Sequence, residues 1–188
     1  MSDPKPGHSG LPLTLMVAAV WACTMSWSGS RAEENPVEVF LHTDFEQGLR
    51  GSTTQGNAEI TLAEARGRSG QHSATIRVAP GAELAYPQHI FDITKGFAAG
   101  DTFDASVWVR SQDVDQDPGA YFVLEYRDGD RRLSIAHSTT GAANGARDWQ
   151  QLTIYGAQVP VGATCLRISL ILHAHGQAWF DDLSVTRT

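Results

Sequence analysis

Short runs in which hydrophobic and polar residues alternate recur along the chain from about residue 37 onward. Phe103–Arg110 and Cys165–His173 show this two-residue period most clearly, and it is typical of a strand with one buried face. No stretch of helical length shows a 3.6-residue period, and Thr61–Arg66 has helix-forming residues but is too short to stand alone. The pattern predicts strands near Val37–Leu41, Ser73–Val78, Leu84–Ile93, Thr102–Arg110, Tyr121–Arg127, Arg132–His137, Gln150–Tyr155, Cys165–His173 and Ala178–Thr186.

Turn-forming residues separate these runs. They are Gly67 and Gly70, Pro80-Gly81, Ala99-Gly100-Asp101, Asp128-Gly129 and Pro160-Val161-Gly162. Asp128-Gly129 lies directly between two strand-like runs and therefore predicts a β-hairpin. Many short strands joined by turns, without a repeat or an internal linker, predict an all-β protein with an antiparallel β-sandwich.

The alternation also predicts which side chains point away from the core. The outward set of interest is Trp108, Arg110, Tyr121, Glu125, Arg127 and Tyr155. We expect one sheet surface to carry these aromatic rings among charged side chains. Sugars have C–H faces that stack on aromatic rings and hydroxyl groups that pair with Arg and Glu, so the set predicts a carbohydrate-binding surface. The alternative is that the aromatic residues cover a neighbouring loop or sheet edge.

The amino-terminal segment has the features of an export signal. Leu11–Met25 is apolar but shorter than the roughly 20 residues that span a bilayer, and Ser30-Arg31-Ala32 has the small-x-small pattern of a cleavage site. We interpret residues 1–32 as a signal peptide or membrane-targeting segment and residues 33–188 as a single domain. Lipidation at Cys23 and an uncleaved anchor stay open as alternatives. The expected location is secreted, periplasmic or in the cell envelope.

Composition narrows the range of partners. The 188 residues include 14 Lys and Arg against 21 Asp and Glu, a formal net charge of −7. This balance argues against nucleic acid, which requires a basic stripe. Only Lys5 and Lys95 are lysines, so a polybasic membrane patch is not expected. Cys165 is the one cysteine outside the predicted leader, and its apolar neighbours predict a buried thiol without a disulfide.

Several segments follow one another in a familiar order and spacing. They are Asp44–Gly48, Ser69–Ile76, Ala99–Arg110, Trp149–Leu152, Val159-Pro160 and Ala178–Val185. Together they resemble a carbohydrate-binding module with the galactose-binding-like jelly roll, close to families four, nine and twenty-two. The resemblance runs from about Val37 to Thr186 and is more specific for the fold than for the ligand. It implies a non-catalytic module that binds a polysaccharide or another glycan.

The same resemblance implies a structural calcium ion that joins the first and last strands. Glu46 and the pair Asp181 and Asp182 match the family's ligand positions, with Asp44 nearby. Oxygen ligands suit calcium. Strand alternation turns Asp181 toward the interior, where a carboxylate needs a cation or hydrogen-bond donors, so we prefer Asp181 to Asp182 as the side-chain ligand. The alternative is that both aspartates cap the edge of the sandwich in water.

Other candidate metal-binding and catalytic sites have less support from the sequence. Asp113–Leu124 begins like a calcium loop but lacks the glycine and the final glutamate of such a loop, so a solvated acidic loop is expected. His173 and His175 lie on one face of a predicted strand, but no third zinc ligand can be placed beside them. The sequence has no nucleophile elbow, no matched Cys–His signature and no phosphate-binding glycine motif.

Three functional hypotheses follow from the sequence. The first is an exported, non-catalytic carbohydrate-binding module with a structural calcium ion. The second is a cell-envelope module that uses the same sandwich to bind a protein partner. The third is a small polysaccharide lyase or hydrolase, because a carboxylate pair could be assembled from Asp104, Glu125 and Asp128.

Overall fold

The computed structural model describes residues 38–138 and 144–188, and this part of the chain consists of β-strands without an α-helix. The strands are β1 (Glu38–Thr43), β2 (Ser52–Gln55), β3 (Glu59–Glu64), β4 (His72–Val78), β5 (Gln88–Ile93), β6 (Thr102–Val114), β7 (Gly119–Asp128), β8 (Arg131–His137), β9 (Gly145–Gln158), β10 (Cys165–His173) and β11 (Gly176–Arg187). The all-β prediction is confirmed. Within these ranges no helix could span a membrane. The predicted leader, residues 1–32, lies outside the described residues.

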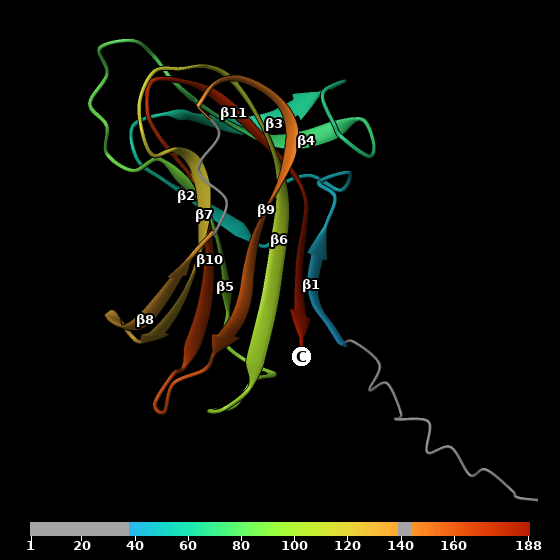
Figure 1. The fold of residues 1–188 in the computed structure, drawn as a ribbon, viewed down its shortest axis with the longest axis vertical. Coiled ribbons are helices and arrows are strands. Elements are labelled where there is room, and N and C mark those ends of the chain that lie inside the picture. Colours follow the sequence, from blue (N-terminus) through green and yellow to red (C-terminus); the bar gives the residue numbers. More distant parts are fainter. Residues whose placement is uncertain (1–37, 139–143) are drawn as a thin grey trace, which may run out of the picture. The chain divides into compact units, whose positions relative to one another are not determined.

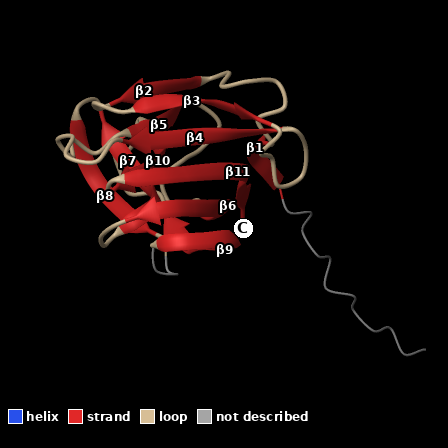
Figure 2. Cartoon of the chain, turned by 90° about the horizontal axis from the view of Figure 1, so that it is seen from above, coloured by secondary structure: helices blue, strands red, loops and turns tan. Residues whose placement is uncertain are grey.

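The strands form two antiparallel sheets that pack face to face, as the sequence predicts. One sheet has the order β3-β4-β11-β6-β9, with β1 also paired to β11, and the other has the order β2-β5-β10-β7-β8. Figure 1 shows β7, β8 and β10 on one side of β6 and β9, and Figure 2 shows β3, β4, β11, β6 and β9 following one another across the first sheet. These are called the six-stranded and the five-stranded sheet below.

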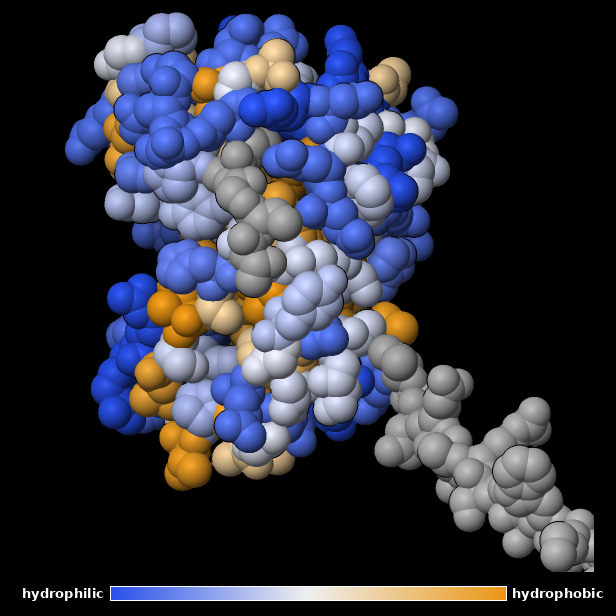
Figure 3. Space-filling model, viewed as in Figure 1, coloured by the Kyte–Doolittle hydropathy of each residue, from blue (hydrophilic) through white to orange (hydrophobic). Residues whose placement is uncertain are grey.

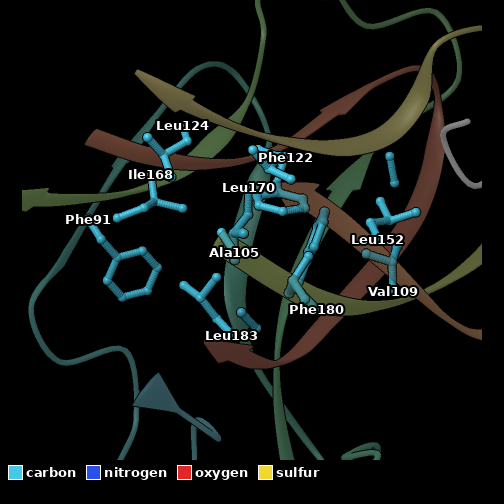
Figure 4. Packing of buried hydrophobic residues seen from close by; sticks show 14 of the residues in the cluster. Phe91, Ala105, Val109, Phe122, Leu124, Leu152, Ile168, Leu170, Phe180 and Leu183 are labelled. Carbon is cyan, nitrogen blue, oxygen red and sulfur yellow. The ribbon is translucent and has the colours of Figure 1, made fainter. Parts of the chain in front are cut away.

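Alternating apolar residues of both sheets fill the space between them. Leu166, Ile168, Leu170 and Leu172 of β10 are all fully buried, as the two-residue period predicts. Figure 4 shows Phe122 and Leu170 of the five-stranded sheet facing Phe180 of the six-stranded sheet. Each fully buried side chain of this size stabilises the fold by roughly 1.5–3 kcal/mol. The core therefore holds the two sheets together.

The structure adds two strands that the sequence pattern did not predict. The four residues of β2 are all polar, and its side chains are mostly exposed. Ala63 and Glu64 of β3 favour helix, but the strand pairs with β4 from Glu59–Arg77 to Glu64–His72. Both strands lie at the edge of their sheets, where pairing with a neighbour decides the conformation.

The start of β5 differs from the prediction, whereas the turn between β7 and β8 agrees with it. β5 begins at Gln88 instead of Leu84, because Pro87 has no N–H to donate and the preceding Tyr86 has a positive φ of 48°. The hairpin predicted at Asp128-Gly129 is confirmed. Asp128 pairs with Arg131 across a two-residue turn, and Gly129 takes the positive φ of 57° that such a turn requires.

β11 is the strand at which the six-stranded sheet branches. Along one edge it pairs with β6. Along its other edge, β4 pairs with the first half, Gly176–Phe180, and β1 pairs with the second half, Leu183–Arg187. Asp181 and Asp182 lie between the two halves, at a register shift against β6, and Asp182 has a positive φ of 49°. The backbone groups where β4 and β1 separate must therefore find partners outside the ladder.

Candidate functional site

The six predicted glycan-contacting residues do not share one surface. Trp108, Arg110 and Tyr155 lie on β6 and β9 of the six-stranded sheet. Tyr121, Glu125 and Arg127 lie on β7 of the five-stranded sheet. The outer faces of a two-sheet sandwich point in opposite directions, so the prediction of a common surface is wrong. Alternation distinguishes inward from outward residues, but it does not say to which sheet a strand belongs.

Arginine side chains lie over two of the tryptophan rings of the six-stranded sheet, Trp108 and Trp179. The Arg68 guanidinium lies 3.7 Å from the centroid of the Trp108 ring and also donates a hydrogen bond to Asp182. Arg110 lies 5.6 Å from the ring centroid of Trp179, which is itself buried. Such cation–π contacts hold the arginines against the sheet. Trp108 therefore packs against Arg68 of the β3–β4 loop, which agrees with the alternative that this ring covers a neighbouring loop.

Tyr155 lies on the same outer face and is 69% exposed. It borders a depression of about 250 Å³ that also includes Asp104, Ser184 and Thr186. No second aromatic ring lines this depression among the described residues. Tyr155 is therefore an isolated exposed ring, of a kind that is common on protein surfaces.

The outer face of the five-stranded sheet carries a larger groove of about 430 Å³, which we call the tyrosine groove. It is lined by Tyr86, Gln88, Tyr121, Val123, Glu125, Arg132, Ile135, His137, Ser169 and Ile171. Its volume falls within the range of about 300–1,000 Å³ that is usual for ligand sites. Val123 and Ile171, both buried, form an apolar floor, because the alternation of β7 and β10 turns them to this face.

Two tyrosine rings stand beside this floor. Tyr121 of β7 is half-buried, and its burial raises the pKa of the phenol. Tyr86 precedes β5, is 52% exposed and stacks on the His173 imidazole, with ring centroids 4.1 Å apart and an interplanar angle of 17°. The stacked imidazole fixes the orientation of the Tyr86 ring. The groove therefore offers two rings in defined positions without any rearrangement.

The polar groups of the groove centre on Glu125, which is 8% exposed. Its Oε1 accepts a short hydrogen bond from Arg127, and its Oε2 lies 3.9 Å from Arg132. Arg127 is also tied to the β7–β8 turn, since it donates to the carbonyl oxygens of Gly129 and Asp130. Arg127 therefore neutralises and orients Glu125, whereas Glu125 itself faces the groove.

A closed ion pair lies on the same sheet face. Arg167 of β10 donates two hydrogen bonds of 2.7 Å to the Asp92 carboxylate of β5, and this contact lowers the pKa of Asp92. The thiol of Cys165 lies 3.6 Å from Asp92 and is partly exposed. The prediction of a buried Cys165 is wrong, because the residue opens β10 on its outer face. Burial and the Asp92 charge raise the pKa of this thiol.

Tyr86, Arg132 and His137 were not predicted as members of a site. Tyr86 lies in a loop that the sequence pattern assigned to a strand, and Arg132 reaches this face because the pairing of β7 with β8 is irregular. His137 pairs with Val123 across β7 and β8, and its ring centroid lies 6.3 Å from that of Tyr121. The two-residue period of the sequence does not indicate that any of these three residues lines a site.

The four predicted calcium ligands accept hydrogen bonds in this structure. Glu46 Oε1 accepts from the backbone N–H groups of Gln71 and His72, each at 2.7 Å, and its Oε2 lies 3.1 Å from the His72 imidazole. These bonds lower the pKa of Glu46. Asp44 accepts from the backbone of Glu46 in a local turn. Each carboxylate therefore points at donors of the chain.

Asp181 and Asp182 bind the loop between β3 and β4 in the same way. Asp181 is fully buried, as predicted, and burial raises its pKa against the opposing effect of its donors. Its Oδ2 accepts from the backbone N–H groups of Arg68 (2.6 Å) and Ser69 (3.3 Å). Asp182 accepts from the Arg68 guanidinium (2.8 Å) and the Ser69 hydroxyl (2.6 Å).

This arrangement, which we call the carboxylate latch, comprises Glu46, Asp181, Asp182 and residues 66–72. Within the described ranges no three His, Cys, Asp or Glu side chains are grouped to hold a metal ion. The carboxylate oxygens face N–H groups and a guanidinium, whose positive ends repel a cation. As arranged here, the residues do not fit a calcium ion.

The second acidic segment also uses its carboxylates internally. Asp115 accepts a hydrogen bond from the backbone N–H of His175 (3.0 Å) and pairs with its imidazole (2.8 Å), which raises the pKa of His175. His173 instead stacks on Tyr86, so the two histidines do not form a metal pair. A cavity of about 300 Å³ beside Asp115 and His175 has no aromatic lining residue in the described part of the chain.

No protein-family model and no curated protein matches the chain. Solved structures do match it. One contains the CBM22-1 and GH10 modules of endo-1,4-beta-D-xylanase 10B from Clostridium thermocellum, complexed with xylohexaose; the TM-score is 0.65 at 18% identity, over 80% of this chain and 28% of that chain. Another is the CBM22-1 xylan-binding domain of Paenibacillus barcinonensis Xyn10C, with a TM-score of 0.63 at 16% identity, over 80% of this chain and 95% of that chain.

A third match is a xylan-binding domain of carbohydrate-binding family 22, with a TM-score of 0.61 at 18% identity, over 79% of this chain and 94% of that chain. At these identities the similarity concerns the fold. The fold is the jelly-roll sandwich of carbohydrate-binding modules, which confirms the resemblance drawn from the sequence.

Proposed function

We propose that this protein is a non-catalytic carbohydrate-binding module that binds a polysaccharide in the tyrosine groove. The observation that carries the proposal is the groove itself, with two oriented tyrosine rings above an apolar floor and polar groups along its side. Sugar rings stack on such platforms while their hydroxyl groups pair with Glu, Gln and Ser. The xylan-binding domains with the same fold support this assignment.

A catalytic role has less support. Glycoside hydrolysis requires two carboxylates on either side of the scissile bond. Among the described residues that line the tyrosine groove, Glu125 is the one carboxylate, and Arg127 holds it. Asp104 lies on the six-stranded sheet, and Asp128 pairs with Arg131 at the hairpin. Asp104 therefore lies on a different sheet from the other two carboxylates, and Glu125 and Asp128 of β7 are each paired with an arginine.

Binding of an envelope protein through the same surface is the second candidate. Protein interfaces are commonly marked by a wide exposed apolar patch. On the face shown in Figure 3, hydrophobic residues are interleaved with hydrophilic ones. The large exposed apolar residues Val39, Tyr86, Tyr155 and Val161 come from four separate parts of the chain. The groove fits a sugar chain better than a flat protein surface.

Affinity gel electrophoresis on a panel of polysaccharides tests the proposal. Xylan, β-glucan, galactan and pectin cast into separate gels are expected to retard the chain in at least one case, without release of reducing ends. Retardation with steady release of reducing ends would replace the proposal with an enzyme. No retardation by any glycan, together with capture of a defined envelope protein, would favour the second candidate.

Export is a separate part of the proposal, and calcium is not included in it. The apolar segment Leu11–Met25 and the site at Ser30-Arg31-Ala32 support a location in the secreted fraction, the periplasm or the envelope, which cell fractionation tests. Calcium is implied by the family resemblance alone. The hydrogen bonds of the carboxylate latch favour a fold that is complete without the ion.

A further inference from the structure

The tyrosine groove is lined by one arginine, Arg132, which is more than half exposed and makes only a long ion pair among the described residues. We propose that the groove takes a glycan bearing carboxylate groups, a uronate polymer, and that Arg132 binds the carboxylate. This inference rests on the proposed function and names the class of polysaccharide. A guanidinium matches a carboxylate with two parallel hydrogen bonds, which makes it the side chain best suited to recognise a uronate.

The other arginines near the groove have their donors committed. Arg127 bonds to Glu125 and to two carbonyl oxygens of the hairpin turn, and its side chain is only 17% exposed. Arg167 is held by both oxygens of Asp92. Arg131 pairs with Asp128 at 2.8 Å. Each of these cations already has its counter-charge.

Arg132 differs from them in both distance and exposure. Its side chain is 57% exposed, and the described partner of its guanidinium is Glu125 at 3.9 Å. That separation is too long for a hydrogen bond. Because Arg127 neutralises Glu125, Arg132 leaves an uncompensated positive charge in the groove of a chain whose formal net charge is −7.

An irregularity in the β7–β8 pairing places Arg132 on this face. Simple alternation from Ile135 and His137, which line the groove, would turn Arg132 toward the core. The register shifts between Tyr126 and Arg127, so that Arg132 pairs with Arg127 and lies on the outer face. Bulges commonly re-aim a side chain in this way near functional sites. Two arginines placed opposite each other repel, so the arrangement has a cost that the fold alone does not explain.

The order of the strands explains how one ligand reaches both features. The sheet order β5-β10-β7-β8 places Gln88 and the adjoining Tyr86 on one side of the groove and Arg132 on the other, with Tyr121 between them. A sugar chain stacked on the tyrosine rings would therefore present its side groups to the β8 edge. A carboxylate there meets the Arg132 guanidinium, whose described partner, Glu125, lies 3.9 Å away.

The test compares matched polymers by isothermal titration calorimetry at about 0.15 M salt. Glucuronoxylan and polygalacturonate are each used before and after chemical reduction of their carboxyl groups to alcohols. The chain is expected to bind at least one charged polymer about 10-fold more tightly than its reduced form, or more. Arg132→Gln is expected to remove this preference, so that the charged and reduced polymers bind with equal affinity, and Arg132→Lys to keep part of it.

Arg131→Gln is the matched control, because it removes the same charge from the neighbouring position on the same strand. It is expected to keep the preference. Equal loss in both variants would show general charge attraction and overturn the role of Arg132. Equal affinity for charged and reduced polymers would overturn the inference and leave the proposed function standing. Failure to bind any polymer, charged or reduced, would overturn the proposed function as well.

Discussion

His89 of β5 shows how a single residue sets the acid sensitivity of this fold. Its side chain is fully buried on the inner face, opposite Leu170 of β10 and Thr54 of β2. Neither ring nitrogen has a hydrogen-bond partner in the described part of the chain. Burial disfavours the charged imidazolium and lowers the pKa of His89 to about 4.

The pH dependence of stability follows from that pKa. The imidazole of His89 takes up its proton near pH 6.5 in the unfolded chain and only near pH 4 in the folded chain, so the contribution of His89 to stability is complete above pH 6.5 and is lost as the pH drops through this window. The contribution of His89 to the fall is about 3 kcal/mol. Urea unfolding from pH 4 to 7 is expected to show a flatter profile for His89→Leu. The exposed His42→Leu serves as control, and an identical profile for wild type and His89→Leu would contradict the account.

The side chains of the groove mark the limit of residue-level prediction from sequence. Tyr121 and Glu125 were predicted to face outward, and the structure places both in the groove. Trp108 was also correctly predicted to point away from the core, but Arg68, distant in sequence, covers its ring. Such contacts depend on loops whose paths leave no periodic signal. The direction of a side chain could thus be predicted, and its partner could not.

At the scale of elements, the carboxylate latch supplies hydrogen-bond acceptors to the backbone where β4 and β1 diverge from β11 and the strand-to-strand hydrogen bonds are interrupted. Three backbone N–H groups, those of Arg68, Ser69 and Asp182, donate to the buried Asp181 carboxylate. Glu46 accepts hydrogen bonds from the N–H groups of Gln71 and His72, and Gly70 allows the close approach, since a Cβ there would lie 2.2 Å from Glu46 Oε1. The latch joins the turn after β1 to the β3–β4 loop, to the start of β4 and to β11.

Asp181→Ala is expected to lower the free energy of unfolding by about 3 kcal/mol or more, because it leaves the three N–H groups without their acceptor. Asp181→Asn keeps an acceptor oxygen and is expected to cost less. Chemical denaturation measures both. Asp44→Ala, which removes only a local turn contact, is the control and should change stability little.

The carboxylate latch also allows a test of whether hydrogen bonds alone or a calcium ion stabilise this part of the fold. With the donors already in place, the melting temperature of the wild-type chain is expected to stay constant when EGTA is added. A fall in the melting temperature with EGTA that calcium reverses would contradict the latch as the complete account and support the ion implied by the resemblance.

The sequence predicted the strands in which buried residues alternate with less buried ones. β6, β7 and β10 each turn one set of alternate apolar residues into the core, so their two-residue period is visible in the sequence. β2 and β3 are edge strands with little burial, and their existence depends on pairing with β5 and β4. Pairing between distant segments has no local sequence signal, which explains why these two strands were missed.

At the scale of the whole molecule, function depends on which strands share a sheet. β6 and β7 are consecutive in the chain but belong to different sheets, so Trp108 and Tyr121 lie on opposite outer faces. The succession of strands and turns predicted an antiparallel sandwich, the family resemblance implied the carbohydrate-binding jelly roll, and the structure and its matches confirm that fold. The location of the groove required the sheet order.

Calorimetric titration of Tyr121→Ala and Tyr155→Ala tests the central claim most directly, with the polysaccharide that retards the wild-type chain most strongly. The two tyrosines lie on opposite sheets, so each variant removes a phenol from one face only. If the tyrosine groove binds the glycan, Tyr121→Ala loses about 10-fold or more in affinity and Tyr155→Ala keeps the wild-type value. Unchanged binding by Tyr121→Ala, or its loss in Tyr155→Ala, would contradict the account.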